Sequence, residues 1–243
     1  MADPRPILFV GDIQGCAAEL AALLEAAGFR AGEHRLLPIG DTINRGPDAP
    51  GVLQLLRDNG AEPIQGNHER NLLERAAHGG PGPKAVEERS ALLQLERAGM
   101  LAEALDWIAT WPLFREGPDW IAVHAGLHPT LPPERTDPAF LTLVRYCDAQ
   151  GNRPAEPDGQ LTEAPPGYQP WDAFYQGTRT VVFGHWALRG LVWQGRLRGL
   201  DTGCVYGGSL SGCWWPAHRL VQVPSRQPRL PDRPPPPSWQ VRA

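Results

Sequence analysis

The chain has 243 residues, of which 42% are hydrophobic and 21% charged, and this balance predicts an ordinary globular protein with one domain and a proper core. Its formal net charge of −4 argues against a general nucleic-acid-binding protein. No apolar run approaches the ~20 residues of a membrane span, and the amino terminus leads directly into an apolar run, so we expect neither a signal peptide nor a membrane partner. The cysteines show no paired spacing, which favours reduced thiols in a cytoplasmic protein.

The first 65 residues alternate between short apolar runs and helical stretches. In chain order, the predicted elements are a strand over residues 7–10, a helix over 17–27, a strand over 36–39, a helix over 52–59 and a weaker strand over 62–65. Gly28 and Gly60 follow the two helices, at the position where glycine commonly ends a helix. Pro63 restricts the last strand to an edge or to its first residue. This β-α-β-α-β order predicts a layered α/β fold.

The middle of the chain is mainly helical by the same criteria. Its predicted elements are helices over residues 69–77 and 86–111, a strand over 120–123 and a helix over 140–147. The first two of these helices are separated by the glycine- and proline-rich residues 79–83. Residues 148–170 are rich in proline, glycine and polar side chains, so they form either a loop near the active site or an insertion.

The last part of the chain returns to strands. These are predicted over residues 180–183, 196–200 and 219–223. Residues 224–243 are mostly proline, arginine and polar residues, which predicts a tail that is poorly ordered or extended over the surface. We therefore expect the globular domain to cover residues 1–223.

Residues of the kinds that bind metal ions follow five of the apolar runs. They are, in chain order, Asp12 and Gln14, then Asp41, then Asn67 and His68, then His124, and finally His185. In open α/β sheets, ligands bind beyond the carboxyl ends of the strands, which is where these residues fall. Turn chemistry would explain aspartate and asparagine at strand ends, but not two histidines at matching positions. The set of two carboxylates, two carboxamides and three imidazoles fits a two-metal site for phosphate chemistry.

The ligand types suggest how such a site is divided. Asp41 is the natural bridging ligand, because a carboxylate can give one oxygen to each cation. Asp12 and Gln14 would bind the first cation, and the second would be bound by Asn67, His124 and His185. Two cations about 3.5–4 Å apart can clamp a phosphoryl group and activate a water molecule as the nucleophile. Mixed carboxylate and imidazole ligands suit Mn²⁺, Fe, Co²⁺ or Zn²⁺ better than Mg²⁺ or Ca²⁺.

Two residues beside these ligands have predicted catalytic roles. His68 directly follows a ligand, so we expect it to face the leaving group as a general acid. Arg45 can hold phosphate oxygens through its planar fork and offset charge that develops in the transition state.

The motifs resemble those of the metallophosphoesterase superfamily, in its phosphoprotein-phosphatase branch. The segments that carry this resemblance are residues 11–15 (GDIQG), 40–46 (GDTINRG), 66–69 (GNHE) and 124–126 (HAG), with the later His185. Residues 11–16 (GDIQGC), 183–187 (FGHWA) and 200–208 (LDTGCVYGG) are similar to the bacterial symmetrical bis(5′-nucleosyl)-tetraphosphatases, which hydrolyse diadenosine tetraphosphate. The motifs span nearly all of the expected globular domain.

The resemblance implies a fold, a cofactor and an activity. The implied fold is an αββα sandwich, with two central mixed sheets flanked by helices, as a catalytic domain over residues 1–223 that includes a small helical cap within residues 72–176. The implied cofactor is a pair of divalent cations, Mn²⁺ first and Co²⁺ next. The implied activity is symmetric cleavage of diadenosine tetraphosphate into two ADP. Other dinucleoside polyphosphates and nucleoside-tetraphosphate caps on RNA 5′ ends fit the same mechanism, and we expect a cytoplasmic monomer.

Two residues depart from the superfamily pattern. Gln14 replaces the histidine of the first motif, and since a carboxamide oxygen is a weaker ligand than imidazole, the first cation is expected to bind more loosely. Asn44 replaces the aspartate that pairs with the catalytic histidine in protein phosphatases, so His68 is expected to be a weaker acid. A pyrophosphate-type leaving group needs less protonation than a serine alkoxide, which favours the dinucleotide substrate.

Some interpretations stay open. Arg145 resembles the second phosphate-binding arginine of the hydrolases, but a solvated helix arginine is an equally good reading. Tyr206 either lines the substrate pocket or packs in the core. A protein serine/threonine phosphatase is a rival function, since residues 40–46 and the His-Glu pair at 68–69 resemble that branch equally well. A non-catalytic binding module is another rival, supported only by Gln14 and Asn44.

Overall fold

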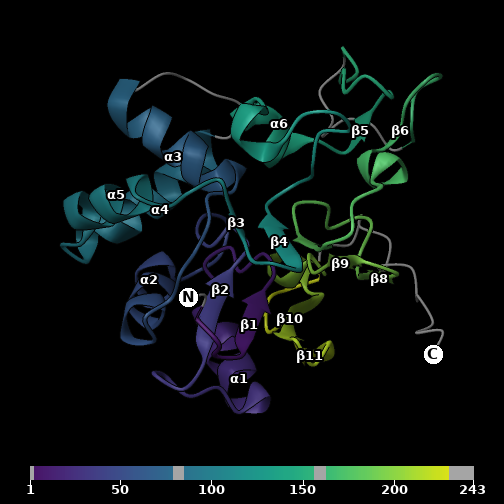
Figure 1. The fold of residues 1–243 in the computed structure, drawn as a ribbon. Coiled ribbons are helices and arrows are strands. Elements are labelled where there is room, and N and C mark those ends of the chain that lie inside the picture. Colours follow the sequence, from purple (N-terminus) through teal and green to yellow (C-terminus); the bar gives the residue numbers. More distant parts are fainter. Residues whose placement is uncertain (1–2, 79–84, 156–162, 230–243) are drawn as a thin grey trace.

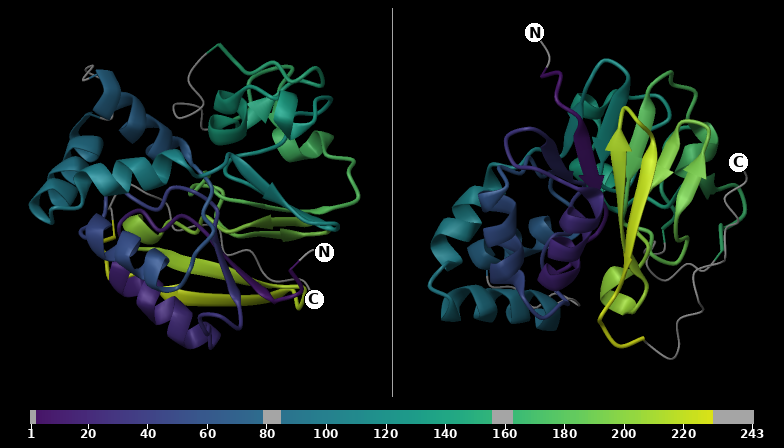
Figure 2. Two further views of the ribbon diagram at one scale, coloured as in Figure 1. Left: turned by 60° about the vertical axis from the view of Figure 1, so that its left-hand side comes forward. Right: turned by 90° about the horizontal axis from the view of Figure 1, so that it is seen from below.

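Two β-sheets face each other at the centre of the molecule, and helices lie on the outer side of each (Figures 1 and 2). The computed structural model describes residues 3–78, 85–155 and 163–229. The αββα sandwich that the sequence predicts is confirmed. The predicted break at residues 79–83 and the residues of the tail beyond 229 lie outside the described part.

The first sheet joins strands from both ends of the chain. Its strands are β1 (Ile7–Val10), β2 (Arg35–Pro38), β10 (Ser209–Trp215) and β11 (Arg219–Pro224), in the spatial order β11-β10-β1-β2. β1 and β2 are parallel, whereas β10 runs antiparallel to β1 with Phe9 opposite Cys213. The last two strands thus complete a sheet that the first two begin.

The second sheet comes from the middle of the chain. Its strands are β3 (Phe114–Glu116), β4 (Trp120–Val123), β7 (Thr180–Phe183), β8 (Val192–Gln194) and β9 (Leu197–Gly199), in the order β3-β4-β7-β9-β8. The central strands β4, β7 and β9 are parallel. A separate short pair, β5 (Tyr146–Cys147) with β6 (Gln169–Pro170), lies outside this sheet.

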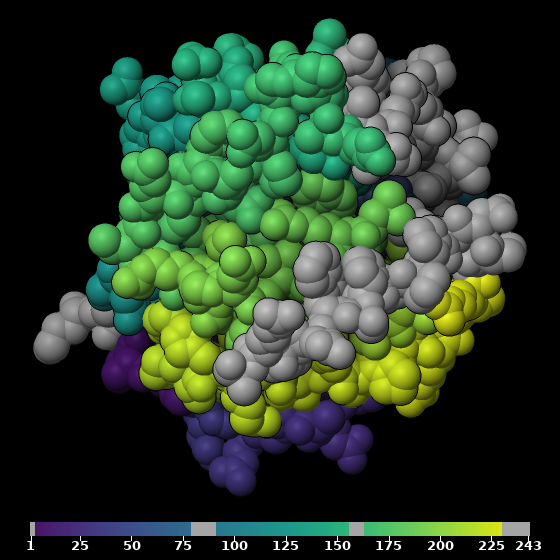
Figure 3. Space-filling view, turned by 90° about the vertical axis from the view of Figure 1, so that its right-hand side faces the viewer, coloured from purple at the N-terminus to yellow at the C-terminus, as the bar shows by residue number. Residues whose placement is uncertain are grey.

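Helices cover the outer side of both sheets. They are α1 (Ala17–Ala27), α2 (Ala49–Asp58), α3 (Asn67–His78), α4 (Ala85–Arg97), α5 (Leu101–Ala109) and α6 (Pro138–Leu143), with 3₁₀ turns η1 (Pro133–Arg135), η3 (Trp171–Phe174) and η4 (Cys204–Tyr206). α1 packs on β10 and β11 and against α2, and α6 and η3 pack on the outer face of the second sheet. In Figure 3, the yellow C-terminal residues lie between the green residues of the second-sheet half and the purple N-terminal residues.

Alternation along each strand divides the core into three layers. In β1, Leu8 and Val10 face the helices, whereas Ile7 and Phe9 face the second sheet. The Phe9 ring meets the Trp120 ring edge-on, with centroids 5.1 Å apart. Burying a side chain of this kind stabilises the fold by roughly 1.5–3 kcal/mol, so the layer between the sheets fixes how they sit on each other.

Several predicted boundaries differ from the observed ones for local reasons. α2 begins at Ala49 rather than residue 52, because the Asp48 side chain accepts a hydrogen bond from the Gly51 amide (2.8 Å) and caps the helix. The predicted helix over 86–111 is two helices, divided where Gly99 adopts a positive φ of 69°. The predicted helix over 140–147 starts at residue 138, ends at residue 143 and continues into β5.

Two other predicted regions differ from the expectation. Residues 62–65 form no strand, although the Glu62 and Ile64 amides donate to carbonyls of β2 at 2.8 Å and 3.2 Å. Residues 72–176, expected to contain the helical cap, also contain β3 and β4 of the second sheet. Within the described ranges, no helix is both long enough and apolar enough to cross a membrane.

Candidate metal centre

The candidate site lies where the carboxyl ends of strands from both sheets meet. Asp12 follows β1 by two residues, Asp41 follows β2, His124 directly follows β4 and His185 follows β7 by two residues. Asn67 opens α3. Because the ends of parallel strands point the same way, these loops lie at one edge of the sandwich, as predicted.

The polar atoms of four of these residues converge on one point. Single ligand atoms of Asp41, His124 and His185 lie within 4.8 Å of one another. The Asn67 Oδ1 atom is 3.1 Å from His124 Nε2 and 2.8 Å from His185 Nδ1, and His124 Nε2 is 3.3 Å from Asp41 Oδ1. The structure therefore assembles most of the predicted second-cation site.

The outward-facing nitrogen of each histidine contacts a backbone carbonyl. His124 Nδ1 is 2.9 Å from the Ile39 oxygen, and His185 Nε2 is 3.1 Å from the Leu143 oxygen. When each of these nitrogens carries its proton, the other nitrogen presents a lone pair toward the Asp41 and Asn67 oxygens. A convergence of acceptors of this kind fits a cation, so the residues present suit the metal ions that the motifs imply.

Asp12 and Gln14 complete the site from the β1 side. Asp12 is buried and accepts the His185 backbone N–H at 3.1 Å. Its pKa is raised well above the ordinary value by burial, and then by the negative charges of Asp201 and Asp41. The Gln14 side chain points its amide nitrogen at the Asp41 carboxylate, with Nε2 3.5 Å from Oδ2. The first-cation side thus concentrates carboxylates that a divalent cation would stabilise.

The Asp41 carboxylate lies at the electrostatic centre of the site. Burial alone would raise its pKa, but the neighbouring His124, His68 and His185 outweigh burial and hold that pKa below the ordinary value. The His68 amide also donates to Oδ1 at 2.9 Å. These surroundings favour the anionic form of Asp41, which is the form that could bind a cation.

Glycine is required next to these ligands because two segments of the backbone approach each other closely there. A Cβ on Gly66 would collide with the Asp41 carboxylate, and one on Gly184 would collide with the Asp12 carboxylate. Both glycines directly precede a predicted ligand. Replacing either would push the ligand loops apart.

His68 and Asn44 form a buried pair beside the ligands. His68 Nε2 lies 3.7 Å from Asp41 Oδ2, and Asn44 Nδ2 lies 3.2 Å from His68 Nδ1. Asn44 thus occupies the position beside His68 where the protein-phosphatase motif has an aspartate. The partner of the His68 imidazole is therefore an amide, as predicted. His68 therefore lies beside the predicted ligand Asp41.

The predicted substrate-binding residues stand around this centre. The Arg45 guanidinium lies over the Tyr206 ring, 5.3 Å from its centroid, which links the loop after β2 to η4. Arg145, between α6 and β5, lies near Asp201, whose pKa is raised by burial, an effect that the positive charge of Arg145 offsets only slightly. All three side chains are partly exposed.

Two buried acidic residues at the site were missed as site residues. The Glu69 carboxylate accepts hydrogen bonds from the backbone amides of Asp41 (2.9 Å), Thr42 (2.7 Å) and Gly66 (2.8 Å) and from the Thr42 hydroxyl (3.0 Å). Asp201 is buried near Asp12, and burial raises its pKa first, followed by the charge of Asp41. Both residues lie within quoted motifs, but only their contacts reveal what they hold.

The fold and this site define a class of enzyme. A family model for calcineurin-like phosphoesterases matches residues 5–189. The chain belongs to the calcineurin-like phosphoesterase family, whose enzymes depend on a dinuclear metal centre. The motif prediction of a metal-dependent phosphohydrolase is confirmed at this level.

Among related proteins, symmetrical bis(5′-nucleosyl)-tetraphosphatases are similar along most of their length. The protein of that name from Acidovorax sp. (strain JS42) is 33% identical, over 83% of this chain and 89% of the relative. The one from Aromatoleum aromaticum is 31% identical, over 89% of this chain and 96% of the relative. The predicted resemblance to this group is confirmed.

Solved structures agree with this assignment. A crystal structure described as that of a candidate diadenosine tetraphosphatase superposes with a TM-score of 0.76 at 32% identity, over 91% of this chain and 94% of the other. A protein serine/threonine phosphatase from Saccharomyces cerevisiae superposes with a TM-score of 0.54 at 17% identity, over 94% and 82%. The second likeness extends to the fold alone.

Proposed function

We propose that this chain cleaves diadenosine tetraphosphate symmetrically into two molecules of ADP. The observation that carries the proposal is the convergence of ligand atoms from Asp41, Asn67, His124 and His185, in a chain 33% identical to a symmetrical bis(5′-nucleosyl)-tetraphosphatase. The proposal includes other dinucleoside polyphosphates and nucleoside-tetraphosphate caps on RNA, because the bond cleaved is the same phosphoanhydride. It also includes a cytoplasmic monomer, and the four free thiols support that location.

Six side chains would hold the cations. They are Asp12, Gln14, Asp41, Asn67, His124 and His185. We infer Mn²⁺ as the physiological ion, with Co²⁺, Fe²⁺ or Zn²⁺ as substitutes, because the donors mix carboxylate, carboxamide and imidazole. Two such cations, when bound, offset phosphate charge and lower the pKa of a water molecule enough to make it a nucleophile near neutral pH.

His68 and Asn44 act on the leaving group. The Asn44 amide donates to His68 Nδ1, so the proton of the neutral ring resides on Nε2, the nitrogen that faces Asp41. In its imidazolium form, His68 passes the Nε2 proton to the departing ADP oxygen and returns to this neutral ring. Asn44 stabilises the imidazolium less than a carboxylate would, and an ADP leaving group tolerates the weaker acid because it is stable as an anion.

The arginines position the polyphosphate. Arg45, held over Tyr206, binds oxygens of the phosphate that is attacked through its planar fork. Arg145, in the segment between α6 and β5, binds the phosphates of the leaving ADP. Together they orient the substrate so that the central anhydride lies in line with the nucleophile.

Product analysis tests the reaction. Metal-stripped full-length chain is incubated with diadenosine tetraphosphate and Mn²⁺ in ¹⁸O-labelled water, and the nucleotides are separated by anion exchange. We expect ADP as the sole product, with the label on one ADP of each pair. AMP and ATP in equal amounts would overturn symmetric cleavage. Asp41→Asn should abolish turnover, whereas Asp58→Asn, at the exposed end of α2, should not.

Phosphoprotein hydrolysis is the second candidate function. It is favoured by the likeness of residues 40–46 and of His68 and Glu69 to the protein-phosphatase motifs. A phosphoserine peptide assayed beside the dinucleotide decides between the two. Faster turnover of the peptide than of the dinucleotide, as kcat/KM, would replace the first proposal with the second.

A further inference from the structure

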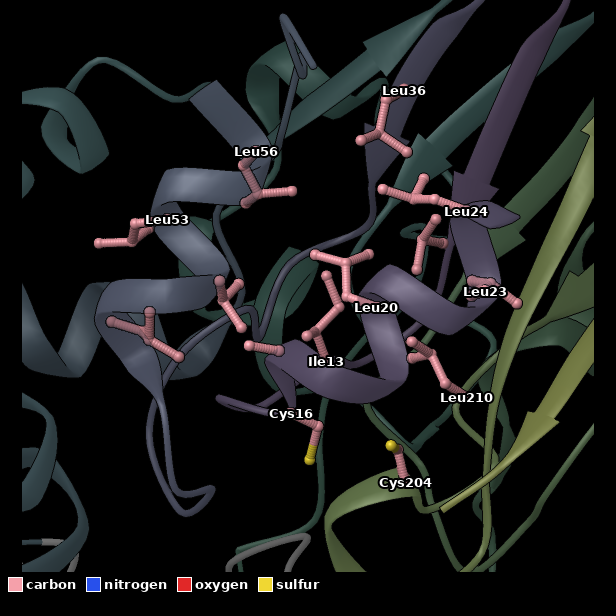
Figure 4. Packing of buried hydrophobic residues seen from close by; sticks show 14 of the residues in the cluster. Ile13, Cys16, Leu20, Leu23, Leu24, Leu36, Leu53, Leu56, Cys204 and Leu210 are labelled. Atoms are coloured by element: carbon pink, nitrogen blue, oxygen red, sulfur yellow. The ribbon is translucent and has the colours of Figure 1, made fainter. Parts of the chain in front are cut away.

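A second cluster of side chains of the kinds that bind metal ions lies where the start of α1 meets η4. It consists of Cys16, Glu19 and Cys204, whose ligand atoms lie within 4.8 Å of one another. Cys16 directly precedes α1, Glu19 lies in its first turn and Cys204 opens η4. Figure 4 shows the two cysteines from different segments of the chain, at the edge of the apolar cluster that packs around α1. All three side chains are buried, with exposed fractions of 0%, 1% and 2%.

Glu19 is the unusual member, because half of its carboxylate has no partner. Its Oε1 atom accepts hydrogen bonds from the Arg226 amide at 2.8 Å and from the Gln227 side chain at 3.0 Å. Its Oε2 atom is fully buried and makes no hydrogen bond. No cationic side chain within the described ranges forms an ion pair with it. A buried carboxylate without a counter-charge is costly, by several kcal/mol in general.

The two thiols do not supply the missing positive charge. Their sulfur atoms lie within 4.8 Å of each other, and the Ser225 hydroxyl donates to Glu19 Oε1 at 3.5 Å. Cys16 also donates weakly to the Gln14 carbonyl, at a sulfur-to-oxygen distance of 3.8 Å. The cluster therefore groups two soft sulfur atoms, one carboxylate oxygen that accepts no hydrogen bond and a hydroxyl, and none of the cationic side chains that the structure describes forms an ion pair with it.

We propose that Cys16, Glu19 and Cys204 bind a thiophilic divalent cation of the Zn²⁺ type, at a site separate from the phosphoesterase centre. Two sulfurs and one carboxylate oxygen are ligands that Zn²⁺ prefers, and a hydroxyl or a water molecule can supply the fourth. The hydrogen bonds from Arg226 and Gln227 orient the carboxylate, so that Oε2 is left to the cation. The cation would offset the charge that the fold otherwise buries.

The three segments joined by this site give it a structural role. Cys16 and Glu19 belong to the start of α1, Cys204 belongs to the turn that carries Tyr206, and Glu19 also anchors the chain after β11. A cation here would fix η4, and with it the Tyr206 ring under Arg45. The site would therefore stabilise the substrate-binding side of the enzyme without touching the reacting phosphates.

Spectroscopy of the metal-loaded chain tests the site independently of catalysis. Untagged full-length Asp41→Asn protein, in which the phosphoesterase centre is impaired, is stripped of metal and titrated with Co²⁺. We expect a sulfur-to-cobalt charge-transfer band in the near ultraviolet that saturates at one equivalent. One equivalent of Zn²⁺ should remove the band, and X-ray absorption of that zinc form should show sulfur neighbours at about 2.3 Å.

Matched variants in the same background assign the ligands. Cys16→Ala and Cys204→Ala should each abolish the band, whereas Cys213→Ala, a buried thiol between the sheets, should leave it unchanged. Glu19→Gln keeps the shape of the side chain and should weaken Zn²⁺ binding by roughly tenfold or more. If either alanine variant does not fold, as judged by circular dichroism, the Glu19→Gln titration decides. A band that is absent from the Cys213→Ala control, or a zinc form with only oxygen and nitrogen neighbours, would overturn the proposal.

Discussion

The candidate metal centre concentrates backbone strain in individual residues. Five of its non-glycine residues have φ between 47° and 69°: Gln14, Asp41, Asn44, Arg45 and His185. Each residue in this left-handed region costs roughly 1–2 kcal/mol relative to a relaxed one. Within the described residues, only one other non-glycine residue shares the conformation. A fold selected for stability alone would place glycine at these positions, so the strain is retained for the side chains.

Glu69 is expected to position the ligand loops without binding the cations. Glu69→Gln replaces one acceptor oxygen by a donor and leaves amides of the Asp41 and Gly66 loops without a partner. We expect a loss of about 2–3 kcal/mol in the free energy of unfolding and a roughly 10–100-fold weaker affinity for Mn²⁺. Urea denaturation and isothermal titration calorimetry measure the two quantities.

The matched control for Glu69 lies on the same helix. Glu74→Gln changes an exposed carboxylate of α3 and should alter neither quantity. A Glu69→Gln protein that loses stability but keeps its full Mn²⁺ affinity would contradict the positioning role.

Asn44 is expected to set which leaving groups the site accepts. Asn44→Asp places a carboxylate next to His68 Nδ1, where the amide nitrogen now lies 3.2 Å away, and a carboxylate stabilises the imidazolium form of His68. We expect turnover of a phosphoserine peptide, whose leaving group needs a strong acid, to rise relative to that of diadenosine tetraphosphate by tenfold or more. The ratio of the two kcat/KM values is the measurement, with Asn59→Asp at the partly buried C-cap of α2 as control. An unchanged ratio would show that Asn44 does not govern acid strength.

At the scale of elements, the sequence predicts the strands and helices that depend only on neighbouring residues. The strands at 7–10, 120–123 and 180–183 and the helix at 17–27 match the observed bounds, because each is a continuous apolar run or a complete amphipathic stretch between clear stop signals. The candidate ligands Asp12, Asp41, His124 and His185 could be predicted for the same reason, since each comes shortly after such a run. β10 was not predicted, because serine and glycine interrupt its apolar residues and its pairing partner β1 is some 200 positions away.

Roles that depend on distant contacts could not be predicted from the sequence. The Glu69 carboxylate accepts hydrogen bonds from amides 27 and 28 positions earlier in the chain. The negative charge of Asp201, which follows a strand of the second sheet, raises the pKa of Asp12, which follows a strand of the first. Neither residue has a local pattern that separates it from an ordinary helix or turn residue. Cys16, which the sequence suggests is only a buried thiol, is placed next to Glu19 and Cys204 by the folding of η4 onto α1.

A half-buried ion pair joins β2 to the segment at residues 62–65, which runs beside it. Arg35 Nε and the Arg35 NH2 nitrogen each lie 2.7 Å from an oxygen of Glu62. These hydrogen bonds hold the pKa of Glu62 below its ordinary value of 4.5. Because the folded pKa is the lower one, the stabilisation is complete above the unfolded pKa and is lost as the pH falls through the folded pKa.

Removing this pair should have a pH-dependent effect. Glu62→Gln should lower the free energy of unfolding by about 1 kcal/mol near pH 7, and the difference from wild type should vanish as the pH falls below the folded pKa of Glu62. Urea denaturation at a series of pH values measures this. Glu33→Gln, which removes the exposed pair with Arg30, should change little at any pH. A Glu62→Gln effect that is constant from pH 7 to acid would show that the ion pair is not its cause.

At the scale of the whole molecule, the metal centre is shared between the two halves of the sandwich. Asp12 and Asp41 come from the first sheet, and His124 and His185 come from the second. The layer between the sheets is apolar, so the cations would provide the polar link at its edge. The stability of the sandwich and the occupancy of the site should therefore be coupled.

Metal addition should raise the melting temperature. A cation at about 100 times its Kd adds roughly 2.7 kcal/mol per site to the free energy of unfolding, and a chain of this size gains about 2–4 °C per kcal/mol. We expect Mn²⁺ at both sites to raise the Tm of the stripped wild-type protein by roughly 10–20 °C, and EDTA to reverse the rise. Differential scanning calorimetry is the measurement. The same rise in Asp41→Asn would show that the ions bind elsewhere.

The pairing of the first strand with a C-terminal strand has a consequence for synthesis on the ribosome. β1 pairs with β2 on one side, but its other side waits for β10, which is translated some 200 residues later. At 5–20 residues per second, that interval is roughly 10–40 s. During it the nascent N-terminal half exposes an unpaired strand edge and the apolar faces of β1, which are features that holdase chaperones recognise and that favour aggregation. The yield of active enzyme should therefore depend on chaperone supply during translation more than on the stability of the finished fold.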